Sequence, residues 1–290
     1  LGWLFNLIQR SKASMQRLWD LFSAEAEVSD GSRTDYSLQS IEGNIEFRGL
    51  TFTYSEKTTA LKDINWQIKK GSKVAIIGRT GSGKTTLTQL LLRVYNPEPG
   101  ELYLDGRDIL EYPLKTLRDN IACVPQDNFL FSATIKENVA FGRETAVFAE
   151  IVDSTKQAGV YENIIEFPEQ FDTKVGERGV TLSGGQKQRV SIARALIRNA
   201  PILILDDSLS AVDTATEELI LNNLQQKTKE QTVIIIAHRI STVQDADDII
   251  VLDEGRIIER GNHEELLKKK GLYADLYRRQ LLEKQIKEYA

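Results

Sequence analysis

Continuous apolar runs occur along the chain, among them residues 74–77, 121–124, 202–205 and 232–236. Runs of this kind are typical of parallel strands that are covered on both faces. Stretches with helical spacing separate them, and this alternation predicts a doubly wound α/β fold with a mostly parallel sheet. Residues 127–200 contain no such run, so we expect a mostly helical subdomain inserted into the sheet there.

A different pattern precedes the first apolar run. Residues 45–54 alternate between apolar and polar positions, with one slip at 48–49 that predicts a bulge. Residues 64–68 alternate in the same way. Because alternation is typical of strands with one buried face, we expect an antiparallel β subdomain ahead of residue 74.

The two ends of the chain also show patterns that predict helices. Apolar residues recur at helical spacing through residues 1–24, which predicts either the cytoplasmic end of a last transmembrane helix or an amphipathic helix packing on this domain or a partner. The strongly apolar start, residues 1–8, is shorter than the about 20 residues that span a bilayer. Because the sequence begins at Leu1, we expect a fragment of a longer protein. The polar residues 25–41 predict a linker, residues 42–270 the main domain, and residues 271–290 a charged amphipathic helix.

Composition argues against one class of partner. The 290 residues include 37 basic and 42 acidic side chains, a net charge of −5, so nothing indicates a basic surface for nucleic acid. Cys123 is the one cysteine, which rules out an intramolecular disulfide. Its place in an apolar run indicates a core residue.

The segment from Gly78 to Thr85 fits the pattern G-x-x-x-x-G-K-[ST], which holds the phosphates of a nucleotide. It follows the run 74–77 and precedes apolar residues at helical spacing, the strand–loop–helix setting that the motif requires. Backbone N–H groups and the helix N-terminus attract phosphate oxygens, Lys84 would reach the β- and γ-phosphates, and Thr85 would ligate Mg²⁺. The predicted nucleotide contacts are Gly78, Arg79, Thr80, Gly81, Ser82, Gly83, Lys84, Thr85 and Thr86.

Two further segments add to this chemistry. The apolar run 202–205 ends in Asp206, where a second Mg²⁺-orienting group belongs beside a phosphate loop. Residues 183–186 read Ser-Gly-Gly-Gln, and Ser183 and Gln186 alone would suit a capping box at the start of a helix. Gly184 and Gly185 each cost about 1 kcal/mol in a helical turn. We therefore expect an anion to approach this backbone closely.

The phosphate loop, the sequence Leu-Ser-Gly-Gly-Gln at 182–186 and the strand ending in Asp206, in this order, resemble the nucleotide-binding domain of an ABC transporter. The resemblance covers about residues 42–270 and implies a P-loop NTPase core that binds ATP and Mg²⁺. It also implies that ATP contacts residues 183–186 of a second domain.

The resemblance assigns further residues. Tyr54 would stack on adenine, Gln126 would contact Mg²⁺ or the attacking water, Asp213 would lie in a loop at the dimer interface, and His238 would touch the γ-phosphate. Each also suits a plainer role: a strand-edge aromatic, a turn residue, a helix N-terminal acid and a strand-end histidine. Residues 173–179 resemble a segment of the exporter branch that contacts the coupling helices of the membrane domain, which favours the transmembrane interpretation of residues 1–24.

Asp207 departs from the family pattern, in which Glu is the general base that polarises the attacking water. Loss of one methylene withdraws the carboxylate by about 1–1.5 Å, and a misplacement of about 1 Å can lower a rate a hundredfold. Unless the backbone shifts to compensate, we expect a weakly hydrolytic site of its own beside an intact signature for a partner.

Taken with the resemblance, this predicts one half of a heterodimeric ABC exporter at the cytoplasmic face of the cell membrane. Its partners would be a second nucleotide-binding domain and the transmembrane domains of both chains. One rival is a homodimeric exporter in which Asp207 is a competent base. Another is a non-transport ABC module, although no long heptad run lies between Thr85 and Ser183, where DNA-clamp relatives carry a coiled coil.

Overall fold

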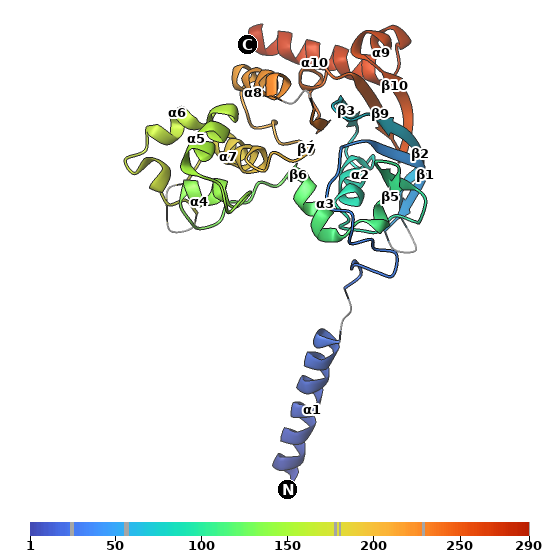
Figure 1. Ribbon diagram of the computed structural model, residues 1–290, viewed down its shortest axis with the longest axis vertical. Coiled ribbons are helices and arrows are strands. Elements are labelled where there is room, and N and C mark those ends of the chain that lie inside the picture. The colour runs from blue at the N-terminus through green and yellow to red at the C-terminus, as the bar shows by residue number, and fades with distance from the viewer. Residues whose placement is uncertain (24–25, 55–57, 177–178, 180, 228–229, 290) are drawn as a thin grey trace.

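The computed structural model describes residues 1–290 except 24–25, 55–57, 177–178, 180, 228–229 and 290. Helix α1, Gly2–Phe22, projects away from the rest of the molecule (Figure 1), and none of its residues is buried. Trp3, Phe5 and Phe22 are among its exposed apolar side chains. Within the described ranges, no helix is long and apolar enough to cross a bilayer.

The stretch predicted as a linker is held against the main body. Arg93 Nη2 donates to the carbonyl of Ser29 at 3.1 Å. The Thr116 hydroxyl donates to the carbonyl of Leu38 at 3.0 Å. Ile41 then enters the core with 4% of its surface exposed.

A six-stranded sheet forms the centre of the molecule. It consists of β3 (Lys73–Gly78), β6 (Ile121–Val124), β7 (Ile202–Asp206), β8 (Thr232–Ile236), β9 (Asp248–Asp253) and β10 (Arg256–Gly261). The strand order is β10-β9-β3-β8-β7-β6, and all neighbours are parallel except β9 and β10. Four of these strands lie where the continuous apolar runs predict them.

Both faces of the parallel strands of this sheet are buried, which explains why these strands are apolar at successive positions. Along β3, Ala75 and Ile77 pack into one hydrophobic core, while Val74 and Ile76 pack into another. The first core includes the helices of the inserted region, and the second includes the antiparallel sheet. The central strands therefore connect the two layers.

The second sheet is antiparallel, as the alternating pattern predicts. It has the order β2-β1-β4-β5, with β1 (Ile45–Thr53), β2 (Thr59–Ile68), β4 (Leu102–Leu104) and β5 (Arg107–Asp108). The register between β1 and β2 shifts between Phe47 and Leu50, where Gly49 has φ of 63°. The predicted bulge is therefore present.

Helices cover the sheets. The phosphate loop leads into α2 (Lys84–Leu91), and the antiparallel sheet leads through the 3₁₀ turn η1 (Ile109–Glu111) into α3 (Leu114–Asn120). Between β6 and β7 lie α4 (Ile135–Ala140), α5 (Phe148–Gln157), α6 (Tyr161–Ile165), η2 (Gln170–Asp172) and α7 (Gly184–Leu196), which Figure 1 shows beside the sheets. The C-terminal third adds α8 (Thr214–Lys227), η3 (Ile240–Thr242), α9 (His263–Lys269) and α10 (Leu272–Tyr289). The α/β fold with an antiparallel part and an inserted helical part is confirmed.

Candidate nucleotide-binding site

Close packing fixes the path of the phosphate loop between β3 and α2. A Cβ on Gly78 would lie 2.2 Å from the carbonyl oxygen of Leu252, and one on Gly83 would lie 2.7 Å from that of Ala60. Gly83 also has φ of 102°, a conformation that side chains other than glycine rarely adopt. These two glycines are therefore required by the fold of the chain itself, and they set the loop at the N-terminus of α2.

Lys84, the first residue of α2, is folded under this loop. It is 7% exposed, and its Nζ donates to the carbonyls of Gly78 at 3.0 Å and Arg79 at 2.9 Å. Burial lowers the pKa of its ammonium, and the carboxylates of Asp206 and Asp207 oppose that effect. The side chain thus supplies a desolvated cation beside two acids.

Asp206 ends β7 within reach of the start of α2. It is 4% exposed, and burial raises the pKa of its carboxyl, with hydrogen bonding to Thr85 as the main opposing effect. A carboxylate and a hydroxyl are hard oxygen ligands of the kind that Mg²⁺ prefers. No cluster of three or more His, Cys, Asp or Glu side chains suited to a metal occurs in the part of the chain that the structure describes. The donor set fits Mg²⁺ bound by few protein oxygens together with the phosphates of a nucleotide.

One pocket of about 520 Å³ gathers most of the predicted site. The predicted residues that line it are Tyr54, Thr80, Gly81, Gly83, Lys84, Thr85, Thr86, Gln126, Asp206, Asp207 and His238. Of the predicted site residues that do not line this pocket, Ser82 is buried, with 3% of its surface exposed. Asp213 and residues 183–186 lie elsewhere. The pocket therefore combines phosphate-loop, acidic and histidine residues from the ends of three strands, β3, β7 and β8.

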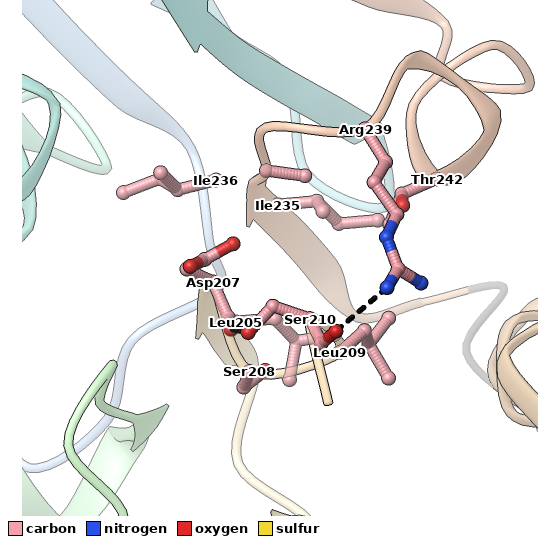
Figure 2. Close-up of a pocket in the computed structure, with 10 residues that line it drawn as sticks. Leu205, Asp207, Ser208, Leu209, Ser210, Ile235, Ile236, Arg239 and Thr242 are labelled. Atoms are coloured by element: carbon pink, nitrogen blue, oxygen red, sulfur yellow. Dashed lines mark hydrogen bonds between the residues drawn. The ribbon is translucent and has the colours of Figure 1, made fainter. Parts of the chain in front are cut away.

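Asp207 follows β7 in a left-handed conformation, with φ of 46°, and its N–H donates to the carbonyl of Ile236 at 2.8 Å. Figure 2 shows its carboxylate lying apart from the guanidinium of Arg239, which reaches Ser210 instead. The small cavity drawn there has a volume of about 10 Å³, too little for a nucleotide. Asp207 also lines the pocket of about 520 Å³, so it borders the same space as Lys84.

Three peripheral residues of the pocket come from separate elements. Tyr54 follows β1, and its hydroxyl bonds to Gln89 Oε1 at 2.6 Å and to Thr86 Oγ1 at 3.0 Å. Gln126 follows β6 and is exposed, and His238 follows β8 and is exposed. Gln126 and His238 are therefore accessible to a ligand, whereas the Tyr54 hydroxyl is already held by two hydrogen bonds, and the roles of all three stay predictions.

The structure adds residues that the sequence does not single out. Lys62 of β2 lines the pocket, together with Thr58, Thr59, Ala60, Glu254 and Gly255. Gly255 has φ of 80°, and a Cβ there would lie 2.6 Å from the carbonyl of Ala60. The turn between β9 and β10 thus packs on β2 and forms a pocket wall. Lys62 interrupts an alternating apolar pattern, which is a weak signal available in the sequence.

The Ser-Gly-Gly-Gln segment starts α7 with a complete capping box. Ser183 Oγ accepts from Gln186 N at 3.2 Å, and Ser183 N donates to Gln186 Oε1 at 2.9 Å. Ser183 and Gly184 are exposed, away from the pocket that Lys84 lines. The N-terminus of α7 therefore lies outside the lining of its own nucleotide pocket.

The two glycines of this segment differ, which corrects part of the argument from sequence. A Cβ on Gly185 would lie 2.8 Å from the carbonyl oxygen of Ala211 in the same chain, so internal packing accounts for Gly185. A Cβ on Gly184 would meet no atom closer than 3.8 Å. Gly184 alone has no internal reason to lack a side chain, and it remains the candidate for contact with an external anion.

We predict opposite effects on stability from alanine at these two positions. Gly185→Ala should lower the free energy of unfolding by about 1–3 kcal/mol, because the new methyl group is overpacked against Ala211. Gly184→Ala should keep it or raise it by up to about 1 kcal/mol, because alanine favours the helix. Urea denaturation of both variants measures the difference, and equal losses would contradict this packing.

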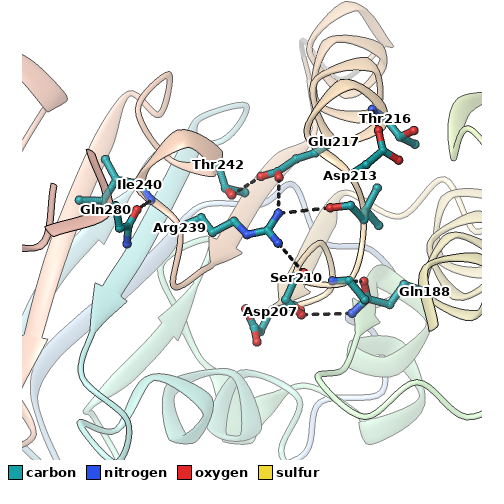
Figure 3. Close-up of polar contacts among 12 residues, drawn as sticks. Gln188, Asp207, Ser210, Asp213, Thr216, Glu217, Arg239, Ile240, Thr242 and Gln280 are labelled. Atoms are coloured by element: carbon teal, nitrogen blue, oxygen red, sulfur yellow. Dashed lines mark hydrogen bonds and ion pairs between the residues drawn. The ribbon is translucent and has the colours of Figure 1, made fainter. Parts of the chain in front are cut away.

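The start of α7 is also tied to the loop that holds Asp213. Gln188 Oε1 accepts from Ala211 N at 2.9 Å, and Arg239 donates to the carbonyl of Ser210 at 2.7 Å and forms an ion pair with the buried Glu217 at 3.2 Å (Figure 3). Asp213 itself accepts from Thr216 N at 3.0 Å at the start of α8, and this hydrogen bond lowers the pKa of its carboxyl. It therefore caps a helix in this structure, and its role at an interface stays a prediction.

Two other features predicted from the sequence are Cys123 and the segment 173–179. Cys123 is half-buried, and burial raises the pKa of its thiol to about 12, as expected of an inert core residue. The segment 173–179 is described only in part, since 177–178 lie outside the described residues.

Comparison with known proteins agrees with the resemblance to ABC transporters. The ABC transporter family pattern matches residues 61–210. An ATP-dependent lipid A-core flippase of Photobacterium profundum is 44% identical over 272 residues, which cover 93% of this chain and 46% of the flippase. ATP-binding cassette sub-family B member 6 of Xenopus tropicalis is 40% identical over 279 residues, covering 96% of this chain and 33% of that protein. The chain spans about half the length of the flippase.

A solved structure of a bacterial Atm1-family ABC exporter with ATP bound matches with a TM-score of 0.89 and 40% identity. The match covers 97% of this chain and 49% of the exporter. Its sequence identity is high enough for the likeness to extend beyond the general fold. Together with the phosphate-loop pocket and the separate signature helix, these matches show that the chain belongs to the ABC transporter family, as an ATP-binding domain of its exporters, a family of ATPases.

Proposed function

We propose that this chain is the ATP-binding domain of an exporter whose own site binds MgATP and hydrolyses it slowly. The observation that carries the proposal is one pocket in which Lys84, Thr85 and Asp206 meet, with Asp207 at the position of the base. The phosphate-handling groups of the family are present there, and the base is shorter by one methylene.

The pocket residues would have separate roles in binding the nucleotide. Backbone N–H groups of the phosphate loop and the N-terminus of α2 would hold the phosphates, and Lys84 would move from the carbonyls of Gly78 and Arg79 to the β- and γ-phosphate oxygens. Thr85, Asp206 and Gln126 would hold Mg²⁺, which supplies charge neutralisation between the phosphates when bound. Tyr54 would stack on adenine, and His238 would contact the γ-phosphate.

Asp207 would take the proton of the attacking water. A base works only within hydrogen-bond reach of that proton. Its backbone N–H is bonded to Ile236, which limits any shift of the chain that could make up the lost reach. We therefore expect slow hydrolysis at this site.

The signature residues Ser183, Gly184, Gly185 and Gln186 would serve a second domain. Their helix N-terminus is exposed and lies outside the pocket of this chain, which supports a contact in trans. A partner carrying Glu at the base position would then hydrolyse its ATP against this signature, as one half of a heterodimer. The loop around Asp213, joined to α7 through Gln188, would lie at the same interface.

The relatives, which include an exporter and a flippase, support a place at a membrane. We propose that the chain acts at the cytoplasmic face of the cell membrane, with transmembrane domains of its own protein and of the partner. Helix α1 suits the end of a last transmembrane helix, because its apolar side chains are exposed and uncovered by the main body.

A mixing experiment tests the arrangement in trans. We combine wild-type chain, which has an intact signature, with the double variant Asp207→Glu, Gly184→Asp. The glutamate restores the reach of the base, and the aspartate places negative charge where an anion would approach while remaining favourable at a helix N-terminus. We expect the equimolar mixture to exceed the summed ATPase rates of the two separate chains, reaching about a quarter of the rate of Asp207→Glu if dimers form at random.

The outcomes separate the proposal from its rivals. A mixture no faster than the sum of its parts contradicts a signature that acts in trans. Full turnover by the wild-type chain alone supports a homodimer with a competent Asp207. Binding of ATP without any gain in turnover from pairing would favour a non-transport ATP-binding module.

A further inference from the structure

The C-terminal helix α10 is anchored into the main domain along its first half. Tyr273 is fully buried, and its hydroxyl lies 2.8 Å from Nδ1 of His263. Glu259 Oε1 accepts from the N–H groups of Leu272, at 2.5 Å, and Tyr273, at 3.4 Å, at the start of the helix. These contacts fix the position and the rotation of α10 on the domain.

One face of α10 extends from the buried Tyr273 to the loop after β8. Tyr273, Tyr277 and Gln280 are separated by four and then three positions, so they lie along one side of the helix. Gln280 is half-buried at the end of this row. Because α10 is anchored on the domain, the side chain of Gln280 has a defined position beside the loop after β8.

Gln280 uses both ends of its amide to hold the loop that bears His238. Its Nε2 donates to the carbonyl of His238 at 2.6 Å, and its Oε1 accepts from the N–H of Ile240 at 2.8 Å. The second bond is drawn in Figure 3. Between these two anchored peptide groups lies Arg239, which reaches to Ser210 and Glu217 on the opposite side. The loop is therefore held from both sides.

We propose that Gln280 is a positioning residue that holds the backbone of the 238–240 loop so that His238 faces the γ-phosphate region of the pocket. His238 is exposed, so the position of the loop backbone sets which region of the pocket its ring can reach. The inference rests on the proposed function, because it takes His238 as a γ-phosphate contact. It makes the C-terminal helix part of the site that discriminates ATP from ADP.

The test compares the affinities of the whole chain for MgATP and MgADP in Gln280→Leu and in wild type. Leucine keeps the apolar packing and removes both hydrogen bonds. We expect the preference for ATP over ADP to fall about fivefold, since two hydrogen bonds that place the γ-phosphate contact are lost. The affinity for ADP should stay unchanged, because the phosphate loop is intact. Gln285→Leu, the same change at an exposed position of the same helix, should leave both affinities as in wild type.

Amide hydrogen exchange at Ile240 supplies a readout that does not depend on nucleotide. Exchange should accelerate in Gln280→Leu and stay slow in Gln280→Glu, whose carboxylate still accepts from that N–H. An unchanged ATP-to-ADP ratio with faster exchange overturns the positioning role while leaving ATP binding in place. A wild-type chain that binds both nucleotides equally would overturn the inference alone, and one that binds neither would overturn it together with the proposed function on which it rests.

Discussion

Replacing Lys84 by alanine is expected to lower the affinity for MgATP by at least about a hundredfold, which corresponds to about 2.7 kcal/mol. Lys84 is 7% exposed, and burial lowers the pKa of its ammonium, so the charge lies where a phosphate would be poorly solvated by water. Charge-assisted hydrogen bonds contribute about 1.5–3 kcal/mol each, and Lys84 would make more than one with the β- and γ-oxygens.

The measurement is equilibrium titration with a fluorescent ATP analogue and Mg²⁺. Lys115→Ala is the matched control, since its side chain is 87% exposed and pairs with Asp119 on α3. We expect the control to bind like wild type and both variants to retain the far-UV dichroism of the fold. An affinity within about threefold of wild type for Lys84→Ala would show that the pocket does not hold phosphates as proposed.

The second large effect is an increase in the ATPase rate. Asp207→Glu is expected to raise the steady-state ATPase rate by about ten- to a hundredfold, because the added methylene returns the carboxylate by about 1–1.5 Å toward the attacking water. ATP affinity should change little, since Lys84, Thr85 and Asp206 are untouched. The rate is measured at high chain concentration, where dimers form.

The same change should slightly destabilise the fold. Residue 207 has φ of 46°, and aspartate tolerates this region better than glutamate does because its short side chain can bond locally. We expect a loss of up to about 1 kcal/mol in the free energy of unfolding. Asp63→Glu is the matched control, because Asp63 has φ of 53° and lies outside the pocket. It should show a similar loss of stability with no gain in rate. An unchanged rate for Asp207→Glu would show that the reach of this carboxylate does not limit hydrolysis.

Much of the fold follows from local pattern. The strands β3, β6, β7 and β8 are predictable because burial on both faces demands an apolar residue at each successive position. Strand β10 follows a different rule. It is an antiparallel edge strand with no fully buried residue, so its sequence carries no apolar run. The pair β4 and β5 have three and two residues, too few for a pattern to emerge.

The features of the site also divide into those that local sequence predicts and those that it does not. The phosphate loop and the capping box of α7 are local motifs, so residues close in sequence determine them. The packing of Gly185 on Ala211 and the bonds of Gln280 to the 238–240 loop join distant segments, and a single sequence carries no record of such pairs. Lys62 enters the pocket for the same reason, through the placement of β2 beside the phosphate loop.

The central claim is that this site binds MgATP and retains it. The most direct test saturates the wild-type chain with MgATP, removes free nucleotide, and identifies the bound nucleotide over time by chromatography. We predict about one nucleotide per chain, recovered mainly as ATP after many minutes. Recovery of ADP within seconds would show that Asp207 hydrolyses efficiently, and recovery of no nucleotide would contradict the ATP site itself.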